Sequence, residues 1–246
     1  MTSPYFALIP AAGSGSRMGA ALPKQYLPLL GRTILQHTVG AFLASPLIQK
    51  TFLVVSADDT WIDALYPTCP ENLEILRCGG ASRAESVCNG LQAIAQQSEQ
   101  SDSWVMVHDA ARPGLTQDLI KHLISQVADD SVGGLLALPV VDTVKRSVAG
   151  QASAYVAQTV PRDGLWLAQT PQLFRLPLLL RAMQEQANNP EITDEASAIE
   201  ALGFAPRMVL GHPCNLKITL EPDLAIAEMY LRAAQTAPSQ NGKKHD

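Results

Sequence analysis

Short apolar runs alternate with amphipathic stretches through the first two thirds of the chain. Each apolar run is too short for a helix, which predicts a buried strand. The expected strands are Tyr5–Ile9, Thr51–Val55, Leu73–Leu76, Trp104–Val107 and Gly134–Leu138. Helices are expected between them, over Ile34–Leu43, Ala84–Ala95 and Asp118–Ala128. This alternation predicts an α/β fold with a mainly parallel, twisted sheet and helices on both faces.

The pattern changes after Pro139. From Val140 to about Thr170, β-prone residues alternate with polar ones around a Gly150-Gln151 turn. This predicts a β-hairpin arm over residues 140–167 that protrudes from the domain. An isolated two-stranded arm buries too little surface to be stable alone, so we expect it to pack on a second copy of the chain in a homodimer. The alternative is an ordinary surface hairpin that folds back on its own domain.

The last third returns to helical patterns, expected over Leu176–Asn188, Asp194–Leu202 and Glu221–Ala234. Short strands are expected at Arg207–Leu210 and Leu216–Ile218. We assign residues 1–235 to a single domain that includes the arm. The polar residues 236–246 lack apolar periodicity and are expected to form a disordered tail.

Composition excludes several classes of protein. The chain has 246 residues and a net charge of −5, which gives no sign of the basic face of a sequence-independent nucleic-acid binder. Its four cysteines show no zinc-ligand spacing and are typical of thiols in a reducing compartment. No run reaches the length of a membrane span. We therefore expect a cytoplasmic protein with no nucleic-acid or membrane partner.

The loop after the first expected strand, Pro10 to Gly19, is rich in small residues and carries Arg17, with Lys24 shortly after it. Small residues let backbone N–H groups approach phosphate oxygens, and the two cations neutralise phosphate charge. The loop therefore predicts a polyphosphate ligand, although glycines often serve only a tight turn. No Gly-Lys-Ser/Thr tripeptide follows, which excludes a P-loop. Met18 stands where a dinucleotide fingerprint needs its third glycine, which argues against a dehydrogenase.

Two further loops carry unusual chemistry. Asp109 directly follows the expected strand Trp104–Val107, where a carboxylate is well placed to hold Mg²⁺. The alternative is a helix cap or a pair with Arg112. Gly79 and Gly80 follow another strand and precede a helix. Ligands bind outside the carboxyl ends of parallel strands, so we expect these loops to converge with the first one on a single site.

Seven motifs occur in order along the chain: Pro10-Ala11-Ala12-Gly13-Ser14-Gly15-Ser16-Arg17-Met18, Pro23-Lys24-Gln25-Tyr26, Gly79-Gly80-x-x-Arg83-x-x-Ser86-Val87, His108-Asp109-Ala110-Ala111-Arg112-Pro113, Asp142-Thr143-x-Lys145, Thr170-Pro171-Gln172 and Ile192-Thr193-Asp194-Glu195-Ala196-Ser197. With them the chain resembles the 2-C-methyl-D-erythritol 4-phosphate cytidylyltransferase family, from about Phe6 to Tyr230. The resemblance implies a nucleotidyltransferase-type, Rossmann-like domain that dimerises through the arm. It also implies transfer of a cytidylyl group from CTP to 2-C-methyl-D-erythritol 4-phosphate, with Mg²⁺, in the non-mevalonate route to isoprenoids.

The resemblance also implies residue roles. The CTP-binding residues would be Pro10, Ala11, Ala12, Gly13, Ser14, Gly15, Gly79, Gly80, Ser86 and Ala110. Arg17, Lys24 and Lys217 would be catalytic, and Asp109 would hold the metal. Arg112, Thr143, Arg162 and Thr170 would bind the sugar phosphate together with Lys217, and Thr143 and Arg162 would come from the other subunit. Ala81-Ser82 stands where relatives often have acidic residues, so an acidic contact to the base is not implied.

The chemistry agrees with these residues independently. A phosphate oxygen of the acceptor attacks the α-phosphorus of CTP in line, so catalysis needs positioning and charge neutralisation rather than a protein nucleophile. Two alternatives stay open. One is a cytidylyltransferase for another polyol phosphate such as ribitol 5-phosphate. The other is a nucleotide-binding regulatory protein without turnover, against which the joint presence of Arg17, Lys24 and Asp109 argues.

Overall fold

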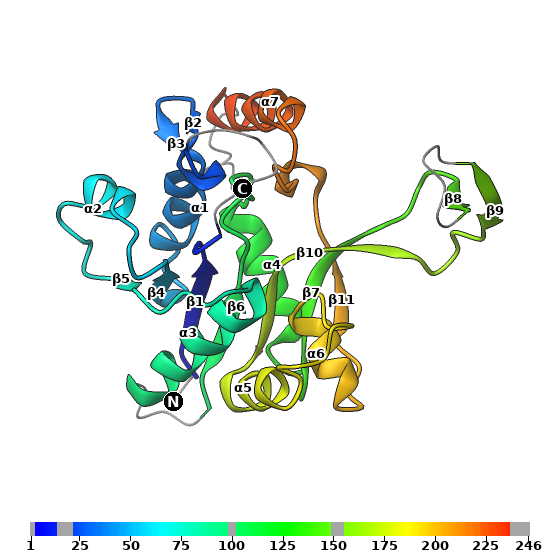
Figure 1. Cartoon of the computed structure of the whole chain (residues 1–246), viewed down its shortest axis with the longest axis horizontal. Helices are drawn as coiled ribbons and strands as arrows, with labels where there is room; N and C mark the ends of the chain where they lie inside the picture. Colours follow the sequence, from blue (N-terminus) through cyan, green and yellow to red (C-terminus); the bar gives the residue numbers. More distant parts are fainter. Residues whose placement is uncertain (1–2, 14–21, 98–101, 149–154, 237–246) are drawn as a thin grey trace, which may run out of the picture.

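The computed structural model describes residues 3–13, 22–97, 102–148 and 155–236. Within these residues, a central sheet of seven strands has the order β11-β7-β10-β6-β1-β4-β5 (Figure 1). The strands are β1 (Tyr5–Pro10), β4 (Ile48–Val54), β5 (Leu73–Leu76), β6 (Trp104–Val107), β7 (Gly133–Pro139), β10 (Trp166–Arg175) and β11 (Arg207–Leu210). All are parallel to one another except β10, which runs antiparallel to both of its neighbours. The predicted mainly parallel α/β sheet is confirmed.

Helices cover both faces of this sheet (Figure 1). They are α1 (Ile34–Leu43), α2 (Trp61–Leu65), α3 (Arg83–Gln97), α4 (Gln117–Val127), α5 (Leu176–Glu185), α6 (Glu195–Ala201) and α7 (Pro222–Thr236). The described residues also form the short 3-10 helices η2 (Lys24–Tyr26) and η3 (Pro213–Asn215) and a small hairpin of β2 (Pro28–Leu29) and β3 (Arg32–Thr33). No helix of the described residues is long and apolar enough to cross a membrane.

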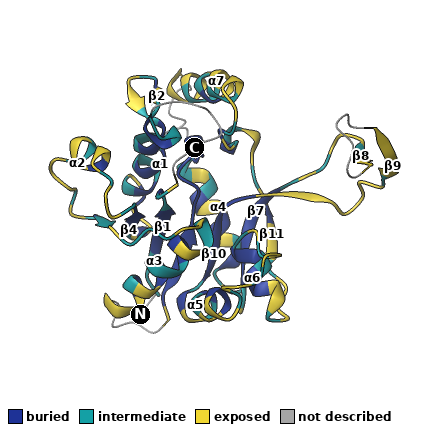
Figure 2. Cartoon of the chain, viewed as in Figure 1, coloured by how far each residue is buried: buried dark blue, intermediate teal, exposed yellow. Residues whose placement is uncertain are grey.

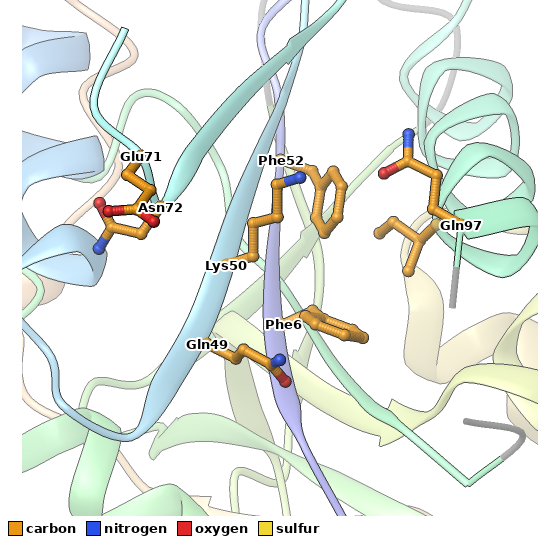
Figure 3. A pocket seen from close by; sticks show the side chains of 8 residues that line it. Phe6, Gln49, Lys50, Phe52, Glu71, Asn72 and Gln97 are labelled. Atoms are coloured by element: carbon orange, nitrogen blue, oxygen red, sulfur yellow. The ribbon is translucent and has the colours of Figure 1, made fainter. Parts of the chain in front are cut away.

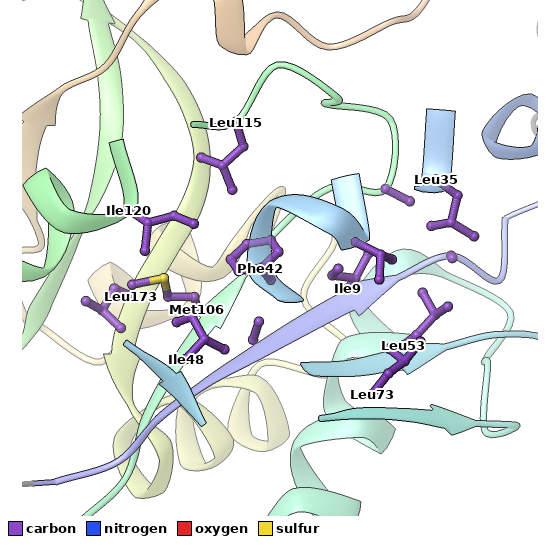
Figure 4. Packing of buried hydrophobic residues seen from close by; sticks show 14 of the residues in the cluster. Ile9, Leu35, Phe42, Ile48, Leu53, Leu73, Met106, Leu115, Ile120 and Leu173 are labelled. Atoms are coloured by element: carbon purple, nitrogen blue, oxygen red, sulfur yellow. The ribbon is translucent and has the colours of Figure 1, made fainter. Parts of the chain in front are cut away.

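The apolar runs became strands because both faces of the sheet are buried. Ile9 of β1 packs with Phe42 of α1 on one face (Figure 4), whereas its neighbour Leu8 packs with Leu91 of α3 on the other. All four side chains are fully buried. Successive residues of a strand point to opposite faces, so a strand covered on both sides needs apolar residues at every position.

The predicted arm protrudes from one edge of the domain (Figure 1). It consists of β8 (Val144–Ser147) paired antiparallel with β9 (Val156–Val160). Figure 2 shows that most of the arm is exposed, including the apolar residues Val141, at 72%, and Tyr155, at 64%. The predicted turn at Gly150-Gln151 lies outside the described residues. Of the tail expected over 236–246, Thr236 is the last residue of α7, and residues 237–246 lie outside the described residues.

Three expectations differ from the structure. The stretch Leu216–Ile218 forms no strand: Ile218 donates one backbone hydrogen bond to Ala111, 2.9 Å, and otherwise packs in a small cluster under α7. The helix expected to reach Asn188 ends at Glu185. Most important, the arm expected over residues 140–167 overlaps β10: Trp166 and Leu167 begin this strand, which was not expected and lies in the middle of the sheet between β7 and β6.

Candidate active site

Three loops that follow β1, β5 and β6 meet at the carboxyl edge of the sheet, as the strand order requires. Together with η2 and the segment after η3, they enclose a pocket of about 440 Å³. The lining residues are Pro10, Ala11, Ala12, Gly13, Lys24, Gln25, Gly80, Ala81, Ser82, Arg83, Ser86, Asp109, Ala110, Ala111 and Lys217. Ten of the residues expected in the site therefore share one pocket.

The entrance of the first loop is held by a buried amide. Gln25 Nε2 donates to the carbonyls of Ala11, at 2.8 Å, and Gly13, at 3.1 Å. The Ser56 hydroxyl donates to the carbonyl of Ala12 at 3.0 Å. These bonds fix the backbone of Ala11, Ala12 and Gly13. The remaining predicted residues of this loop, Ser14, Gly15 and Arg17, lie outside the described residues.

The second loop packs directly on the first. A Cβ atom at Gly79 would lie 2.3 Å from Cβ of Ala12, so the approach of the two loops requires a glycine there. The Gly79 amide donates to Val55 O at 2.9 Å, and the Gly80 amide donates to the Ser86 hydroxyl at 3.0 Å. Both N–H groups already donate within the chain. Any backbone hydrogen bond between these two glycines and a ligand is therefore expected to use their carbonyl oxygens as acceptors.

Asp109, in the third loop, is surrounded by cations. Its Oδ1 accepts from Arg83 Nε at 2.8 Å, and its Oδ2 lies 2.9 Å from Lys217 Nζ and 3.5 Å from Arg112 Nε. Burial alone would raise the pKa of this carboxyl group, but the positive charges of Arg83, Lys217 and Arg112 outweigh burial and hold the pKa well below its usual range. Asp109 is therefore fully ionised at neutral pH.

Lys24, the first residue of η2, lines the same pocket as the glycine loop. Its Nζ donates to the carbonyl of Ile218 at 2.6 Å, next to Lys217. The side chain of Lys217 is 44% exposed, whereas that of Asp109 is 10% exposed. The pocket thus presents two ammonium groups around one carboxylate, which suits a ligand with several negative charges.

The residues expected to bind the sugar phosphate are more dispersed. Arg112 and Thr170 are buried beside Asp109: Arg112 Nη1 donates to Asn215 O at 2.7 Å, and the Thr170 hydroxyl accepts from the Asp109 amide at 3.1 Å. Thr143 and Arg162 are exposed on the arm and do not line this pocket. Arg162 donates to the carbonyl of Val141 in its own arm. Their contribution to a site therefore depends on a second copy of the chain and stays a prediction.

Sequence reasoning gave no role to Arg83 or Glu195, although both stand in the seven motifs. Arg83 Nη1 contacts Glu195 Oε1 at 2.7 Å, and Glu195 is fully buried. The two residues are 112 positions apart, so no local spacing could reveal the pair. Gln25, Ala81, Ser82 and Ala111 also line the pocket without having been assigned to it.

His108 precedes Asp109 and is completely buried. Its Nδ1 lies 2.9 Å from the Thr170 hydroxyl, its Nε2 lies 3.2 Å from Arg112 O, and its ring meets Phe42 edge to face. Burial lowers the pKa of His108 to about 3, so the ring is neutral at physiological pH. A buried neutral histidine makes stability depend on pH.

The free energy of unfolding is therefore expected to fall as the pH drops below about 6.5, where unfolded histidine takes up a proton. Between about 6.5 and 3 the unfolded state binds one more proton than the folded state, which costs about 1.4 kcal/mol per pH unit. In a His108→Gln variant this contribution is absent, so its stability deficit relative to wild type should shrink by about 2 kcal/mol from pH 7 to pH 5. Urea unfolding at several pH values measures this, with exposed His122→Gln as the control. A constant deficit would contradict the assignment of a neutral His108.

A second cavity, of about 490 Å³, lies near the start of β1 and β4 and the end of α3 (Figure 3). Phe6, Phe52 and Gln97 are among its lining residues. Its cation Lys50 pairs with Glu74 at 2.5 Å and lies 5.3 Å from the centre of the Phe52 ring. This cavity is remote from the carboxyl edge, and its cation is already neutralised. The chemistry favours the pocket around Asp109.

Comparison with known proteins agrees with this site. The family model described as IspD, 2-C-methyl-D-erythritol 4-phosphate cytidylyltransferase, matches residues 5–233. The chain belongs to this family. A curated cytidylyltransferase of this name from Dechloromonas aromatica (strain RCB) is 51% identical over 230 residues, which are 93% of this chain and 98% of the relative. The one from Burkholderia multivorans (strain ATCC 17616 / 249) is 49% identical over 96% of this chain and its own full length, 100%.

Solved structures of the family have the same fold. A crystal structure of a 4-diphosphocytidyl-2C-methyl-D-erythritol synthase superposes with a TM-score of 0.82 at 39% identity, covering 94% of this chain and 99% of that one. The IspD enzyme of Francisella tularensis gives a TM-score of 0.79 at 38% identity, covering 93% and 100%. The predicted nucleotidyltransferase-type fold and the predicted family are both confirmed.

Proposed function

We propose that this IspD family member transfers a cytidylyl group from CTP to 2-C-methyl-D-erythritol 4-phosphate. The products are 4-diphosphocytidyl-2-C-methyl-D-erythritol and pyrophosphate, in isoprenoid precursor biosynthesis by the non-mevalonate pathway. The observation that carries the proposal is the pocket at the carboxyl edge, where Lys24, Lys217 and Asp109 meet two loops of small residues. Two ammonium groups beside a carboxylate and small-residue loops suit a bound triphosphate. Cytosine as the base and 2-C-methyl-D-erythritol 4-phosphate as the acceptor follow from membership of the family.

The pocket supplies what an in-line displacement at the α-phosphorus needs. The acceptor phosphate is already an adequate nucleophile, and the reaction spreads negative charge over the α-phosphate and the leaving pyrophosphate. Lys24 and Lys217 lie where they can neutralise that charge, and both belong to backbone segments fixed by hydrogen bonds. The carbonyls of Gly79 and Gly80 are suited to accept from the exocyclic amino group of cytosine.

We further propose that Asp109 holds Mg²⁺ in this reaction. A single carboxylate is sufficient, because Mg²⁺ keeps several waters and takes its other ligands from nucleotide phosphates. No group of three metal-binding side chains exists among the described residues, which agrees with a metal that binds mainly through the nucleotide. When bound, Mg²⁺ neutralises phosphate charge and orients the triphosphate. Asp109 is ionised and faces the pocket, as this role requires.

The arm is proposed to join two copies of the chain. Val156 in β9 and Leu167 at the root of the arm are 62% and 60% exposed, and such apolar surface on a thin hairpin needs a partner. In a dimer, Thr143 and Arg162 would add a hydroxyl and a guanidinium to the pocket of the partner subunit. We expect the enzyme to act in the cytoplasm, since all four cysteines are free thiols.

The first test is pyrophosphate release from CTP and Mg²⁺ with two acceptors in parallel. We expect release with 2-C-methyl-D-erythritol 4-phosphate and background release with ribitol 5-phosphate. Release with ribitol 5-phosphate alone would keep the cytidylyltransferase chemistry and overturn the acceptor. Background release with both acceptors would favour a binding protein without turnover.

A further inference from the structure

A buried ion-pair chain connects the pocket to helix α6. Glu195, at the start of α6, accepts from both terminal nitrogens of Arg83, Nη1 at 2.7 Å and Nη2 at 3.2 Å. The third nitrogen of the same guanidinium, Nε, donates to Asp109 Oδ1 at 2.8 Å. One planar group thus contacts two carboxylates in fixed directions, which a lysine cannot do because it carries a point charge on a flexible stem.

Glu195, at the end of this ion-pair network away from the pocket, is held rigidly. Glu195 is completely buried, and its position is set by β10: the Gln172 amide oxygen accepts from the Ala196 amide at 2.7 Å, and Gln172 Nε2 donates to Asp194 at 2.8 Å. A buried carboxylate without a partner is strongly unfavourable, so Glu195 holds Arg83 in place. Arg83 itself is the first residue of α3.

The two carboxylate oxygens of Asp109 have different partners. Oδ1 is bound by Arg83, which is anchored on Glu195. Oδ2 is bound by Lys217 at 2.9 Å, whose side chain is 44% exposed and can move to a ligand, and it lies at a longer 3.5 Å from Nε of the buried Arg112. The fixed contact determines the rotation of the carboxylate, and the exchangeable contact faces the pocket.

We propose that Arg83, anchored by Glu195, is a positioning residue that fixes the Asp109 carboxylate so that Oδ2 is presented to the metal–nucleotide complex. This inference rests on the proposed function of the pocket. Without Arg83, the carboxylate rotates to share both oxygens with Lys217 and Arg112, and neither oxygen is then available to a metal. Glu195 acts on the reaction only through Arg83.

The test uses Arg83→Lys and Glu195→Gln, which keep side-chain size, and their combination. We expect Arg83→Lys to lower kcat about ten- to hundredfold, which is the usual effect of replacing a residue that orients a metal ligand. KM for CTP should change less than about threefold. The double variant should be no slower than Arg83→Lys alone, since the two residues act in series. Losses that multiply in the double variant would overturn the proposal.

A second readout is independent of turnover. Mn²⁺ bound by the complex of enzyme and CTP, measured by electron paramagnetic resonance, should be about tenfold weaker in Arg83→Lys than in wild type. Arg175→Lys is the matched control, because Arg175 pairs with Asp102 at 2.9 Å and lies over the Trp104 ring, away from the pocket. It should change Tm but neither kcat nor Mn²⁺ affinity.

The outcomes separate the two proposals. If Arg83→Lys lowers only Tm, with kcat and Mn²⁺ affinity equal to wild type, the pair is a structural tie between α3 and α6 and the inference is wrong. If wild-type protein itself releases no pyrophosphate, the proposed function fails, and the Mn²⁺ measurement still decides whether Arg83 positions Asp109.

Discussion

Replacing Lys24 with alanine is expected to lower kcat/KM by about a hundred- to a thousandfold, the cost of removing one charged donor from a developing oxyanion. The Lys24 ammonium group lines the pocket and is held by Ile218 O at 2.6 Å, so it is preorganised before substrate binds. Its positive charge stabilises the transition state more than the bound substrate, because negative charge on the phosphates grows during the reaction. Steady-state kinetics with CTP and the sugar phosphate measure the loss.

Lys50→Ala is the matched control for this experiment. It deletes the same atoms from a lysine that lies in the second cavity and pairs with Glu74. This variant should keep the kcat/KM of wild type, with at most a small change in Tm, since half-exposed ion pairs contribute little to stability. A Lys24→Ala enzyme with the kcat/KM of the Lys50→Ala enzyme would show that Lys24 has no part in catalysis.

Mixing two inactive variants, Lys24→Ala and Arg162→Ala, is expected to restore activity. If Arg162 acts in the pocket of the partner subunit, a mixed dimer has one pocket with its own Lys24 and with Arg162 supplied by the other chain. Random pairing makes about half of the dimers mixed, each with one intact site, so activity should return to about a quarter of wild type. Co-expression and an assay of the unfractionated dimers measure this. The mixed dimer purified through two affinity tags should show about half of the wild-type activity, because one of its two sites is intact.

The control mixes Lys24→Ala with Lys217→Ala. Both lysines line the pocket of the same chain, so no pairing of these two variants creates an intact site and activity should stay at background. Failure of the Lys24 and Arg162 pair to exceed this background would mean that Arg162 does not act across the dimer.

The parallel strands could be predicted from the sequence because their buried residues are apolar, and β10 could not because several of its buried residues are polar. Strands buried on both faces consist of apolar residues throughout, as in β1 and β6, and such runs are visible in a sequence. In β10, the buried residues Gln169, Thr170 and Gln172 are polar and hydrogen-bonded, and Pro171 interrupts the stretch. A polar pattern with a proline is typical of surface structure. Only the three-dimensional partners of these side chains reveal that they lie inside.

Site residues could be predicted from the sequence where the signal lies within one loop. Asp109 and Lys24 follow from local signals, namely a carboxylate after a buried strand and a cation after a loop of small residues. The link from Asp109 through Arg83 to Glu195 depends on a contact between α3 and α6, over 112 positions of sequence. The expected strand around Lys217 was wrong because Ile218 is apolar for packing under α7 rather than for a place in the sheet.

Strand β10 joins the root of the arm to the residue that holds the Asp109 backbone, so both belong to one segment of the chain. Within four residues it passes from Leu167, which is 60% exposed, to the buried Thr170 that holds the Asp109 amide. Inserting or deleting one residue in this stretch is expected to displace Thr170 and break its contact with the Asp109 amide. We therefore expect a single-codon insertion at the root of the arm to inactivate the enzyme, although the root lies outside the pocket.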